Sequence, residues 1–489
     1  MAFSEAHYLV NIMAHTLVFD PALTKENPSA VLAQFFSSVR FEDLPPEVVA
    51  RTEEAFVDWF GCALAGTGTR QIVALEKFAA EMGPSDGRSE ILTTRKRTSP
   101  FFAALLNGAA SHIAEQDDVH NGGMFHPGTT VFPAILAAAE DQGISGKEFI
   151  VASVVGYEAA IRTAEFLGPD HYKVFHTTGT AGMIGAAVGV ARLLRLDAKK
   201  TLDALGTAGT QATALWEFLR DAADSKLLHS GRAAAAGLMS AYLARDGFTG
   251  ATHILEGKQG LAVALSRGAT TDTAKLTDDL GTRWTILECT YKPYSCCRHT
   301  HPSVDALMKL MRENNLKPDD IAHVTAHVHQ GALDVLGGVI VPGTTYESKF
   351  CMGFVLALAA IHQSIGFDDF SEESLKDPKI SAFRERVGMT LNPDVPRNAH
   401  VQPGWVEVET RDGRHLEVRV PDAKGDPQNT LTRDELVTKA QQLATYTGAA
   451  TAEEVVRIAS VAWTLHDAPN ISELFLGRVE THFYDASAD

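Results

Sequence analysis

GWVEVETRDGRHLEVRV, residues 404–420, decides the fold class, because it joins two runs in which apolar and polar side chains alternate. Alternation at a period of two is typical of a half-buried strand, and Arg411, Asp412 and Gly413 between the runs predict a hairpin. IAHVTAHVH, residues 321–329, alternates in the same way, and RWTILECTYKP, residues 283–293, is interpreted as extended. The sequence therefore predicts an α+β region over residues 282–429.

Helical patterns dominate the chain on both sides of this region. Ala-rich segments with helical periodicity precede it, and two segments with polar capping residues follow it: 46–65, 133–140, 146–166, 181–194 and 202–215, then 432–445 and 451–465. The Ala and Gly content predicts helices that approach closely, in a multi-helix bundle. The chain is thus expected to be mostly α, with two lobes in its 489 residues and the C-terminal tail packed on the first lobe.

Composition limits the possible partners. With 61 acidic and 43 basic residues the formal charge is -18, which disfavours binding to nucleic acid or to an anionic membrane. An anionic substrate would need a locally basic pocket. Residues 1–20 lack the pattern of a secretory signal, and no apolar run is long enough to span a bilayer. Five cysteines, an odd number, favour a reducing compartment, so we expect a soluble, cytoplasmic protein.

Three basic residues precede predicted helices. His126 stands in MFHPGTT, His176 in FHTTGTAGM, and Lys226 in DSKLLHSGRAAAAG. Backbone N–H groups at a helix start attract anions, so the three positions together indicate a carboxylate site. Taken singly, each side chain is better explained by local hydrogen bonds in a polar loop, and only the coincidence of three such positions favours a site.

AEQDDVHNGGMFHP, residues 114–127, gathers carboxylates and imidazoles around a Gly pair: Glu115, Asp117, Asp118, His120 and His126. Such a set could bind a divalent metal, or it could supply an acid–base pair oriented by neighbouring carboxylates. It could also be structural, with the two aspartates capping the turn before Gly122 and Gly123. The spacing alone leaves these alternatives open.

CTYKPYSCCRHTHPSVDAL, residues 289–307, holds four further basic side chains: Lys292, Arg298, His299 and His301. A lysine at a domain junction can neutralise a substrate carboxylate, although a solvent-facing strand end would carry the same charges. Cys296 and Cys297 are adjacent and lack the spacer of common zinc or redox pairs, which favours a packing role over metal binding.

Together these segments resemble the MmgE/PrpD family, which includes 2-methylcitrate dehydratase, cis-aconitate decarboxylase and an iminodisuccinate epimerase. The resemblance runs over nearly the whole chain, in the order DWFGCALAG, EQDDVH followed by HPG, FHTTGTAG, SKLLHSGRAA, YKPYSCCRHTH and ESKFCMGF. It implies a large all-helical domain built from both chain ends, residues 1–281 and 430–489, with an inserted α+β lid domain, residues 282–429. It further implies an active site in the cleft between them, and a homodimer.

The resemblance implies that the acidic stretch 115–118 and the basic residues of the matching motifs belong to the active site. The catalytic residues are thereby predicted to be His126, His176, Lys226, Lys292, Asp117 and Asp118, and the substrate-binding residues Glu115, His120, Arg298, His301 and Cys297. Animal decarboxylases show a threonine in place of Val119 and a histidine in place of Cys297, whereas fungal decarboxylases share the double cysteine. The particular reaction therefore stays open.

These residues suit the removal of a proton beside a carboxylate. Lys226 and Lys292 would stabilise the developing charge, with the substrate rather than the protein as their partner, while one histidine takes the proton and the other donates one. We expect a lyase for a small di- or tricarboxylic acid that needs no cofactor and no metal, most similar to a 2-methylcitrate dehydratase. Decarboxylation and epimerisation are the alternatives within the family. Two lower-ranked alternatives come from other functional classes: a metal-dependent hydrolase and a non-catalytic helical binding protein.

Overall fold

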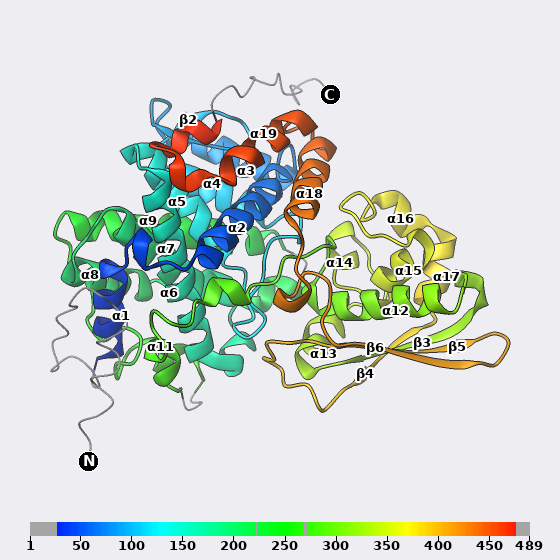
Figure 1. The fold of residues 1–489 in the computed structure, drawn as a ribbon. Coiled ribbons are helices and arrows are strands. Elements are labelled where there is room, and N and C mark those ends of the chain that lie inside the picture. The colour runs from blue at the N-terminus through cyan, green and yellow to red at the C-terminus, as the bar shows by residue number, and fades with distance from the viewer. Residues whose placement is uncertain (1–26, 222, 268–270, 476–489) are drawn as a thin grey trace, which may run out of the picture.

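The computed structural model describes residues 27–221, 223–267 and 271–475, and the chain is mostly α-helical, as predicted (Figure 1). The segment examined for a secretory signal, residues 1–20, lies outside the described residues. Most helices gather in one part of the molecule, and the four-stranded sheet lies with a smaller group of helices beside it.

The larger part, here called the body, contains the helices from the two ends of the chain. They are α1 (Pro28–Ser38), α2 (Pro46–Leu64), α3 (Arg70–Met82), α4 (Pro100–Ser111), α5 (Gly128–Gln142), α6 (Gly146–Tyr172), α7 (Thr177–Leu193), α8 (Ala198–Gly209), α9 (Ser225–Arg245), α10 (Leu261–Leu265), α11 (Ala274–Thr277), α18 (Arg433–Tyr446) and α19 (Ala452–Ala462). Each segment predicted to be helical contains or overlaps one of these helices.

Two local predictions for the body are wrong. The helix expected over residues 202–215 ends at Gly209, because Leu215 forms an isolated bridge with Phe175 instead. The body is also not wholly helical, since β1 (Ser89–Glu90) and β2 (Arg97–Thr98) form a short antiparallel pair.

Glycines let the central helices of the body approach closely. A Cβ built on Gly185 of α7 would lie 2.6 Å from the carbonyl oxygen of Gly156 on α6. A Cβ on Gly237 of α9 would lie 2.7 Å from the carbonyl oxygen of Met183 on α7. Real side chains do not fit at such distances, so the small residues allow the close helix packing that the composition predicts.

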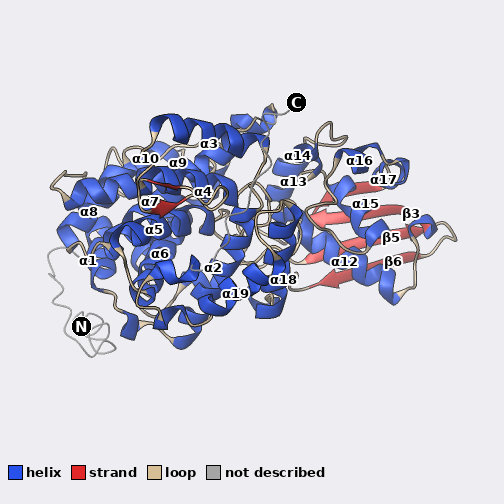
Figure 2. Cartoon of the chain, turned by 90° about the horizontal axis from the view of Figure 1, so that it is seen from above, coloured by secondary structure: helices blue, strands red, loops and turns tan. Residues whose placement is uncertain are grey.

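The smaller part, here called the lid, is built on the predicted sheet. Its strands are β3 (Ile321–Val328), β4 (Val387–Leu391), β5 (Gly404–Thr410) and β6 (His415–Val420), in the order β4-β3-β5-β6. β5 and β6 form the predicted hairpin, with Gly413 at φ 86° in its turn. α12 (His301–Glu313) and α15 (Met352–His362) pack against the sheet (Figure 2).

The remaining lid helices are short: α13 (Gln330–Leu336), α14 (Thr345–Ser348), α16 (Glu372–Lys376) and α17 (Pro378–Arg384). The segment expected to be extended at the start of this region is only partly so. Thr285–Glu288 forms a 3-10 helix, and only Thr290 makes a strand-like bridge, to Val119.

The two parts have separate hydrophobic cores. One core takes its buried residues from Leu32 to Tyr291 and again from Leu431 to Leu474, and the other from Cys296 to Val408. The described C-terminal helices thus add to the core of the first helices. The domain boundaries at residues 282 and 429 stay a prediction.

α18 returns to the body and packs on α2. A Cβ on Gly61 of α2 would lie 2.6 Å from the Cα of Ala440, so the glycine is needed for this approach. Next to it, the buried Nζ of Lys439 donates to Asp58 Oδ1 at 2.6 Å and to the carbonyl oxygen of Gln116 at 2.5 Å. The last helices therefore support the acidic stretch that contains the candidate site.

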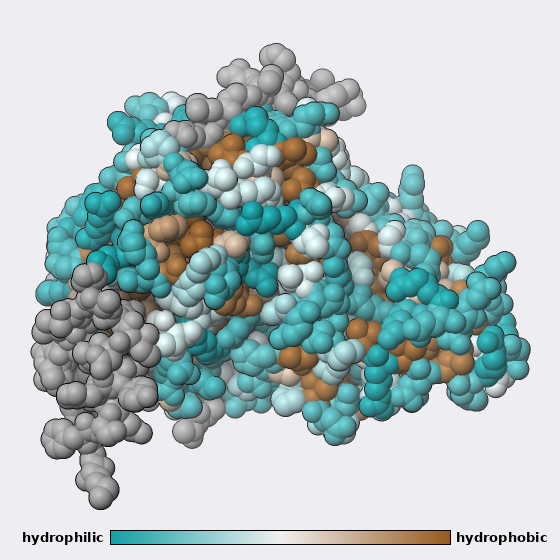
Figure 3. All heavy atoms as spheres, viewed as in Figure 1, coloured by the Kyte–Doolittle hydropathy of each residue, from teal (hydrophilic) through white to brown (hydrophobic). Residues whose placement is uncertain are grey.

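None of the described helices has both the length and the apolar character needed to cross a membrane. The face of the molecule seen in Figure 3 is largely hydrophilic and carries small, separate hydrophobic areas on both the body and the lid.

Candidate active site

A cavity lies between body and lid. Seven of the eleven predicted site residues line it: Glu115, His126, His176, Lys226, Lys292, Cys297 and Arg298. The other lining residues are Val119, Asn121, Met124, Tyr172, Trp216, His299, Val335, Phe350 and Gln402. The three sequence clusters, far apart along the chain, therefore meet at one place.

Helix starts position three of these residues, as predicted. His176 is the N-cap residue of α7, Lys226 is the second residue of α9, and His126 lies two residues before α5. The backbone N–H of His126 donates to Thr178 Oγ1 at 3.2 Å, which ties the start of α5 to the start of α7.

Glu115 holds the two lysines together. Lys226 Nζ donates to Glu115 Oε1, and Lys292 Nζ lies 3.7 Å from Oε2, with all three side chains buried. Burial opposes ionisation of Glu115, but the two ammonium charges outweigh it and hold its pKa at about 2. The expectation that the substrate alone partners the lysines is thus wrong, because a buried cation needs a counter-charge in the protein as well.

Asp117 stands behind His126. Its Oδ2 lies 3.0 Å from His112 Nδ1, with which it shares a hydrogen bond, and 2.8 Å from His126 Nδ1, which is within ion-pair distance. Burial would raise the pKa of Asp117, yet His112, His126 and Lys292 hold it well below its usual range. His126 Nδ1 also lies 2.9 Å from the carbonyl oxygen of Asp118, which can only accept. The proton of neutral His126 therefore sits on Nδ1, and Nε2 is the basic nitrogen.

His112 was not predicted from the sequence. It is buried at the C-terminus of α4, and its ring stacks on His176 with centroids 5.6 Å apart and lies 4.7 Å from the ring of His126. Burial lowers its pKa to about 4, against the pull of Asp117, so the ring is neutral at pH 7. Its position in HIAEQDD, five residues before Asp117, was the available sequence signal.

His176 is neutral as well. Burial, reinforced by the charge of Lys226, lowers its pKa well below the usual value. His176 Nδ1 lies 3.3 Å from His229 Nδ1, and its ring lies 4.7 Å from that of Trp216.

Arg298 brings a cation from the lid. Its Nη2 donates to Asp426 Oδ1 at 2.6 Å, while Nε and Nη1 are buried and have no hydrogen-bond partner among the described residues. Cys297 lies beside it, and burial raises the pKa of this thiol to about 11, so it stays protonated. The two predicted substrate-binding residues thus offer a free guanidinium edge and an uncharged thiol.

The other four predicted site residues do not line the cavity. Asp117 acts from behind His126, as described, and Asp118 accepts from Tyr157 Oη at 2.7 Å and from the Gly128 N–H at 2.9 Å. His120 Nε2 lies 3.3 Å from Glu288 Oε2, and His301 Nε2 lies 3.2 Å from the Cys296 carbonyl oxygen. His120 and His301 are close in sequence to residues that line the cavity, but their rings bind other protein groups instead of facing it.

Lys349 is a second residue that the sequence analysis missed, although it stands in ESKFCMGF. Its buried Nζ donates to the Ala114 carbonyl oxygen at 2.9 Å and to Ser295 Oγ at 3.2 Å. Burial lowers its pKa to about 7. Ala114 precedes Glu115, whose φ of 55° is unusual for a residue with a side chain, so Lys349 ties the lid to a strained point of the site.

Among the described residues, two groups of side chains lie close enough together to hold a metal: His112, Asp117 and His126, and separately His120, Glu165, Glu288 and His400. In the first group, His126 Nδ1 is committed as a donor to the Asp118 carbonyl oxygen and lacks a free lone pair. In the second, Arg283 binds Glu165 and Glu288 at 2.7 Å each and already neutralises them. The donor chemistry thus fits hydrogen bonding better than metal binding.

Fold and site together define an enzyme with histidines and lysines enclosed between a helical body and an α+β lid. Comparison with known proteins gives the family. The family model of the MmgE/PrpD N-terminal domain matches residues 30–274, and that of the C-terminal domain matches residues 294–465. The chain belongs to the MmgE/PrpD family, as the sequence motifs indicated.

Curated relatives of known name are lyases. The chain is 26% identical to the cis-aconitate decarboxylase-like protein oryM of Aspergillus oryzae over 92% of this chain and 96% of the relative. It is 25% identical to cis-aconitate decarboxylase of Aspergillus terreus over 80% and 84%, and 23% identical to the human enzyme of that name over 89% and 91%. The chain is therefore similar to these enzymes over nearly all of their length.

Proposed function

We propose that the chain is a lyase for a small di- or tricarboxylic acid, and that it decarboxylates an unsaturated tricarboxylate of the cis-aconitate kind. The observation that carries the proposal is the meeting of a proton-transferring imidazole with two separate cationic positions in one enclosed cavity. The names of the relatives favour decarboxylation over the dehydration expected from the sequence.

The cations account for the substrate class. Lys226 and Lys292 share the single charge of Glu115, which leaves one unit of positive charge for a substrate carboxylate. Two nitrogens of Arg298, Nε and Nη1, have no partner among the described residues, and their N–H groups can donate to a second carboxylate. A substrate with two or more carboxylates can use both positions, whereas a monocarboxylate would leave one buried cation without a partner.

His126 is the residue for proton transfer. When the ring carries both protons, Nδ1–H faces Asp117 and the Asp118 carbonyl oxygen, and Nε2–H can protonate a carbon of the substrate. In the decarboxylation the bond to the departing CO₂ breaks, its electron pair shifts into a new double bond, and the old double bond takes the proton from Nε2. Lys226 and Lys292 stabilise the negative charge that develops on a substrate carboxylate while the electron pair shifts. No redox step occurs, so the reaction needs no redox cofactor.

Dehydration is the second candidate, and neutral His176 favours it. A hydro-lyase needs a base to take the α-proton while an acid protonates the leaving hydroxyl, and His176 and His126 can divide these tasks. The same pair could also catalyse epimerisation, in which the proton returns to the opposite face.

The experiment is a substrate screen in D₂O with product identification by NMR. cis-Aconitate, 2-methylcitrate, citrate and iminodisuccinate are each incubated with the purified protein. Release of CO₂ with one deuterium in the product supports decarboxylation, and loss of water without CO₂ supports the hydro-lyase. Absence of turnover on all four acids, or hydrolysis abolished by a chelator, would contradict the proposal.

A further inference from the structure

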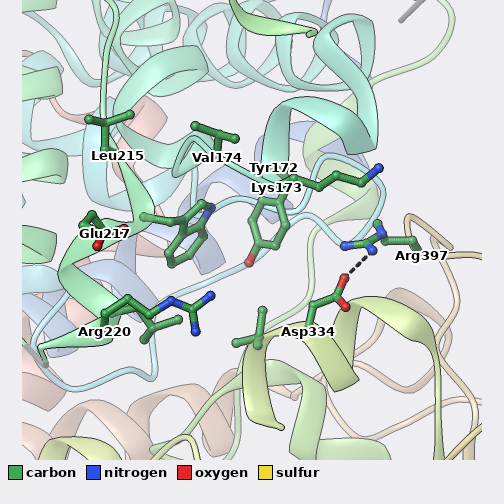
Figure 4. A pocket seen from close by; sticks show the side chains of 11 residues that line it. Tyr172, Lys173, Val174, Leu215, Glu217, Arg220, Asp334 and Arg397 are labelled. Atoms are coloured by element: carbon green, nitrogen blue, oxygen red, sulfur yellow. Dashed lines mark ion pairs between the residues drawn. The ribbon is translucent and has the colours of Figure 1, made fainter. Parts of the chain in front are cut away.

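A larger pocket lies directly outside the active-site cavity. It shares Tyr172, Trp216 and Val335 with the cavity. Tyr172 and Trp216 belong to the body and Val335 to α13 of the lid, so the two spaces are separated by three side chains where body and lid meet. Figure 4 shows this outer pocket with Tyr172 beside Asp334 and Arg397 of the lid.

One cation in the outer pocket is uncommitted. Arg397 forms an ion pair with Asp334, and Lys173 forms one with Asp170. Arg220 is exposed, and no ion pair or hydrogen bond of its side chain is found among the described residues. In Figure 4 its guanidinium extends into the pocket. A Cβ on Gly338 of the lid would lie 4.0 Å from Arg220 Nη1, so this side chain reaches across to the lid.

We propose that the outer pocket is a docking site for the carboxylates of the incoming acid, with Arg220 as the binding residue, and that the acid then passes Tyr172, Trp216 and Val335 to reach His126. The inference rests on the proposed function only in taking the ligand to be a carboxylate. It assigns a second binding site, outside the cavity where the reaction occurs.

Charge gives the physical reason. The chain carries a formal charge of -18, which repels a multiply charged anion at long range. A guanidinium without a partner presents paired N–H donors that match a carboxylate, and its charge raises the local concentration of the anion at the narrow point. An exposed arginine elsewhere on the surface would only be hydrated. Here it stands in a concave site that borders the catalytic cavity.

Trp216 supplies a reporter at the narrow point. Its ring lies 5.1 Å from that of Tyr172 and 4.7 Å from that of His176, and its buried Nε1 has no hydrogen-bond partner among the described residues. An acid passing from one space to the other must contact this indole. We therefore expect bound tricarballylate, a tricarboxylate without a double bond or a leaving hydroxyl, to change the tryptophan emission, and Trp216→Phe to abolish that change.

Stopped-flow fluorescence with tricarballylate tests the docking role. Arg220→Gln should lower the association rate constant about 3- to 10-fold at low salt, Arg220→Glu should lower it further, and both differences should fade at high ionic strength. Arg245→Gln is the matched control, with the same change in net charge at the far end of α9, about 30 Å from its start.

The outcomes separate the two proposals. If Arg220→Gln and Arg245→Gln associate at the same rate with the same salt dependence, the docking site is wrong. Lys226→Met reports on the inner site independently. Loss of tight tricarballylate binding in that variant supports the proposed function even if Arg220 fails, whereas wild-type binding in it contradicts the proposed function.

Discussion

His126 Nδ1 and Asp117 Oδ2 lie 2.8 Å apart in a buried part of the site, so the carboxylate orients the imidazole. Asp117→Asn keeps the shape but removes the charge. We expect turnover to fall about 10²- to 10⁴-fold, with little change in the thermal midpoint of unfolding. Asp434→Asn, on the exposed side of α18, is the control. Turnover within a factor of three of wild type would remove Asp117 from the site.

If the reaction is the dehydration, the second candidate above, the two histidines of the cavity should act in one chemical step as base and acid. His126→Ala and His176→Ala are each expected to lower kcat about 10³-fold, and the double variant should be little worse than either. If both residues only bind carboxylate, the losses should instead fall on KM and be additive. Exchange of the substrate α-hydrogen with D₂O, measured in each variant, identifies the histidine that takes the proton.

Lys226 should affect stability as well as turnover, because it pairs with buried Glu115. Lys226→Met removes one of two counter-charges, and we expect it to lower the free energy of unfolding by about 3 kcal/mol, the lower end for a broken buried pair. Adding Glu115→Gln should restore most of that stability but no turnover. Urea unfolding and kinetics of the single and double variants make the comparison. Recovery of activity in the double variant would show that the lysine serves only Glu115.

Asp118 should make stability depend on pH. Burial, together with the charge of Asp58, raises its pKa to about 7 from an ordinary value of 3.8. The folded chain thus holds a proton that the unfolded chain releases between these values. The stabilisation is fully present below pH 3.8, is lost as the pH rises through 7, and amounts to at most about 4 kcal/mol. Urea unfolding from pH 4 to pH 8 should show a smaller decrease for Asp118→Asn than for wild type. Parallel curves would contradict the shift.

The family resemblance predicts a homodimer, and light scattering across the micromolar range should give twice the chain mass of 52.6 kDa. The Ala- and Gly-rich faces of α7 and α9 are buried within the chain and do not form this interface. A monomer at all concentrations would make the prediction wrong.

Local patterns predicted the elements well where one physical signal dominated. The alternation of residues 404–420 gave the β5–β6 hairpin, and Thr432 and Thr451 cap the last two helices as their sequences predict. The prediction failed at Leu215 and at Thr285–Glu288, where contacts with distant residues decide the conformation. Neighbouring residues carry no information about such contacts.

Most residues that line the cavity were predicted, but the hydrogen bonds and ion pairs between them were not. His126, His176, Lys226 and Lys292 were found because each stands in a marked motif. His112 and Lys349 were missed because their roles come from tertiary contacts, with Asp117 in one case and with the Ala114 carbonyl in the other. His120 was overestimated, since proximity in sequence does not show where a ring points.

The contact of Lys439 with Asp58 and with the Gln116 carbonyl has a consequence for biosynthesis. The acidic stretch emerges from the ribosome more than 300 residues before the lysine that supports it. Until α18 has been translated, Asp58 of the nascent chain has no Lys439 to pair with, and the face of α2 at Gly61 is not covered by Ala440. The newly made protein thus exposes an apolar surface and an incomplete site during most of its synthesis, which is the condition under which chaperones bind. Catalysis can begin only when almost the whole message has been read.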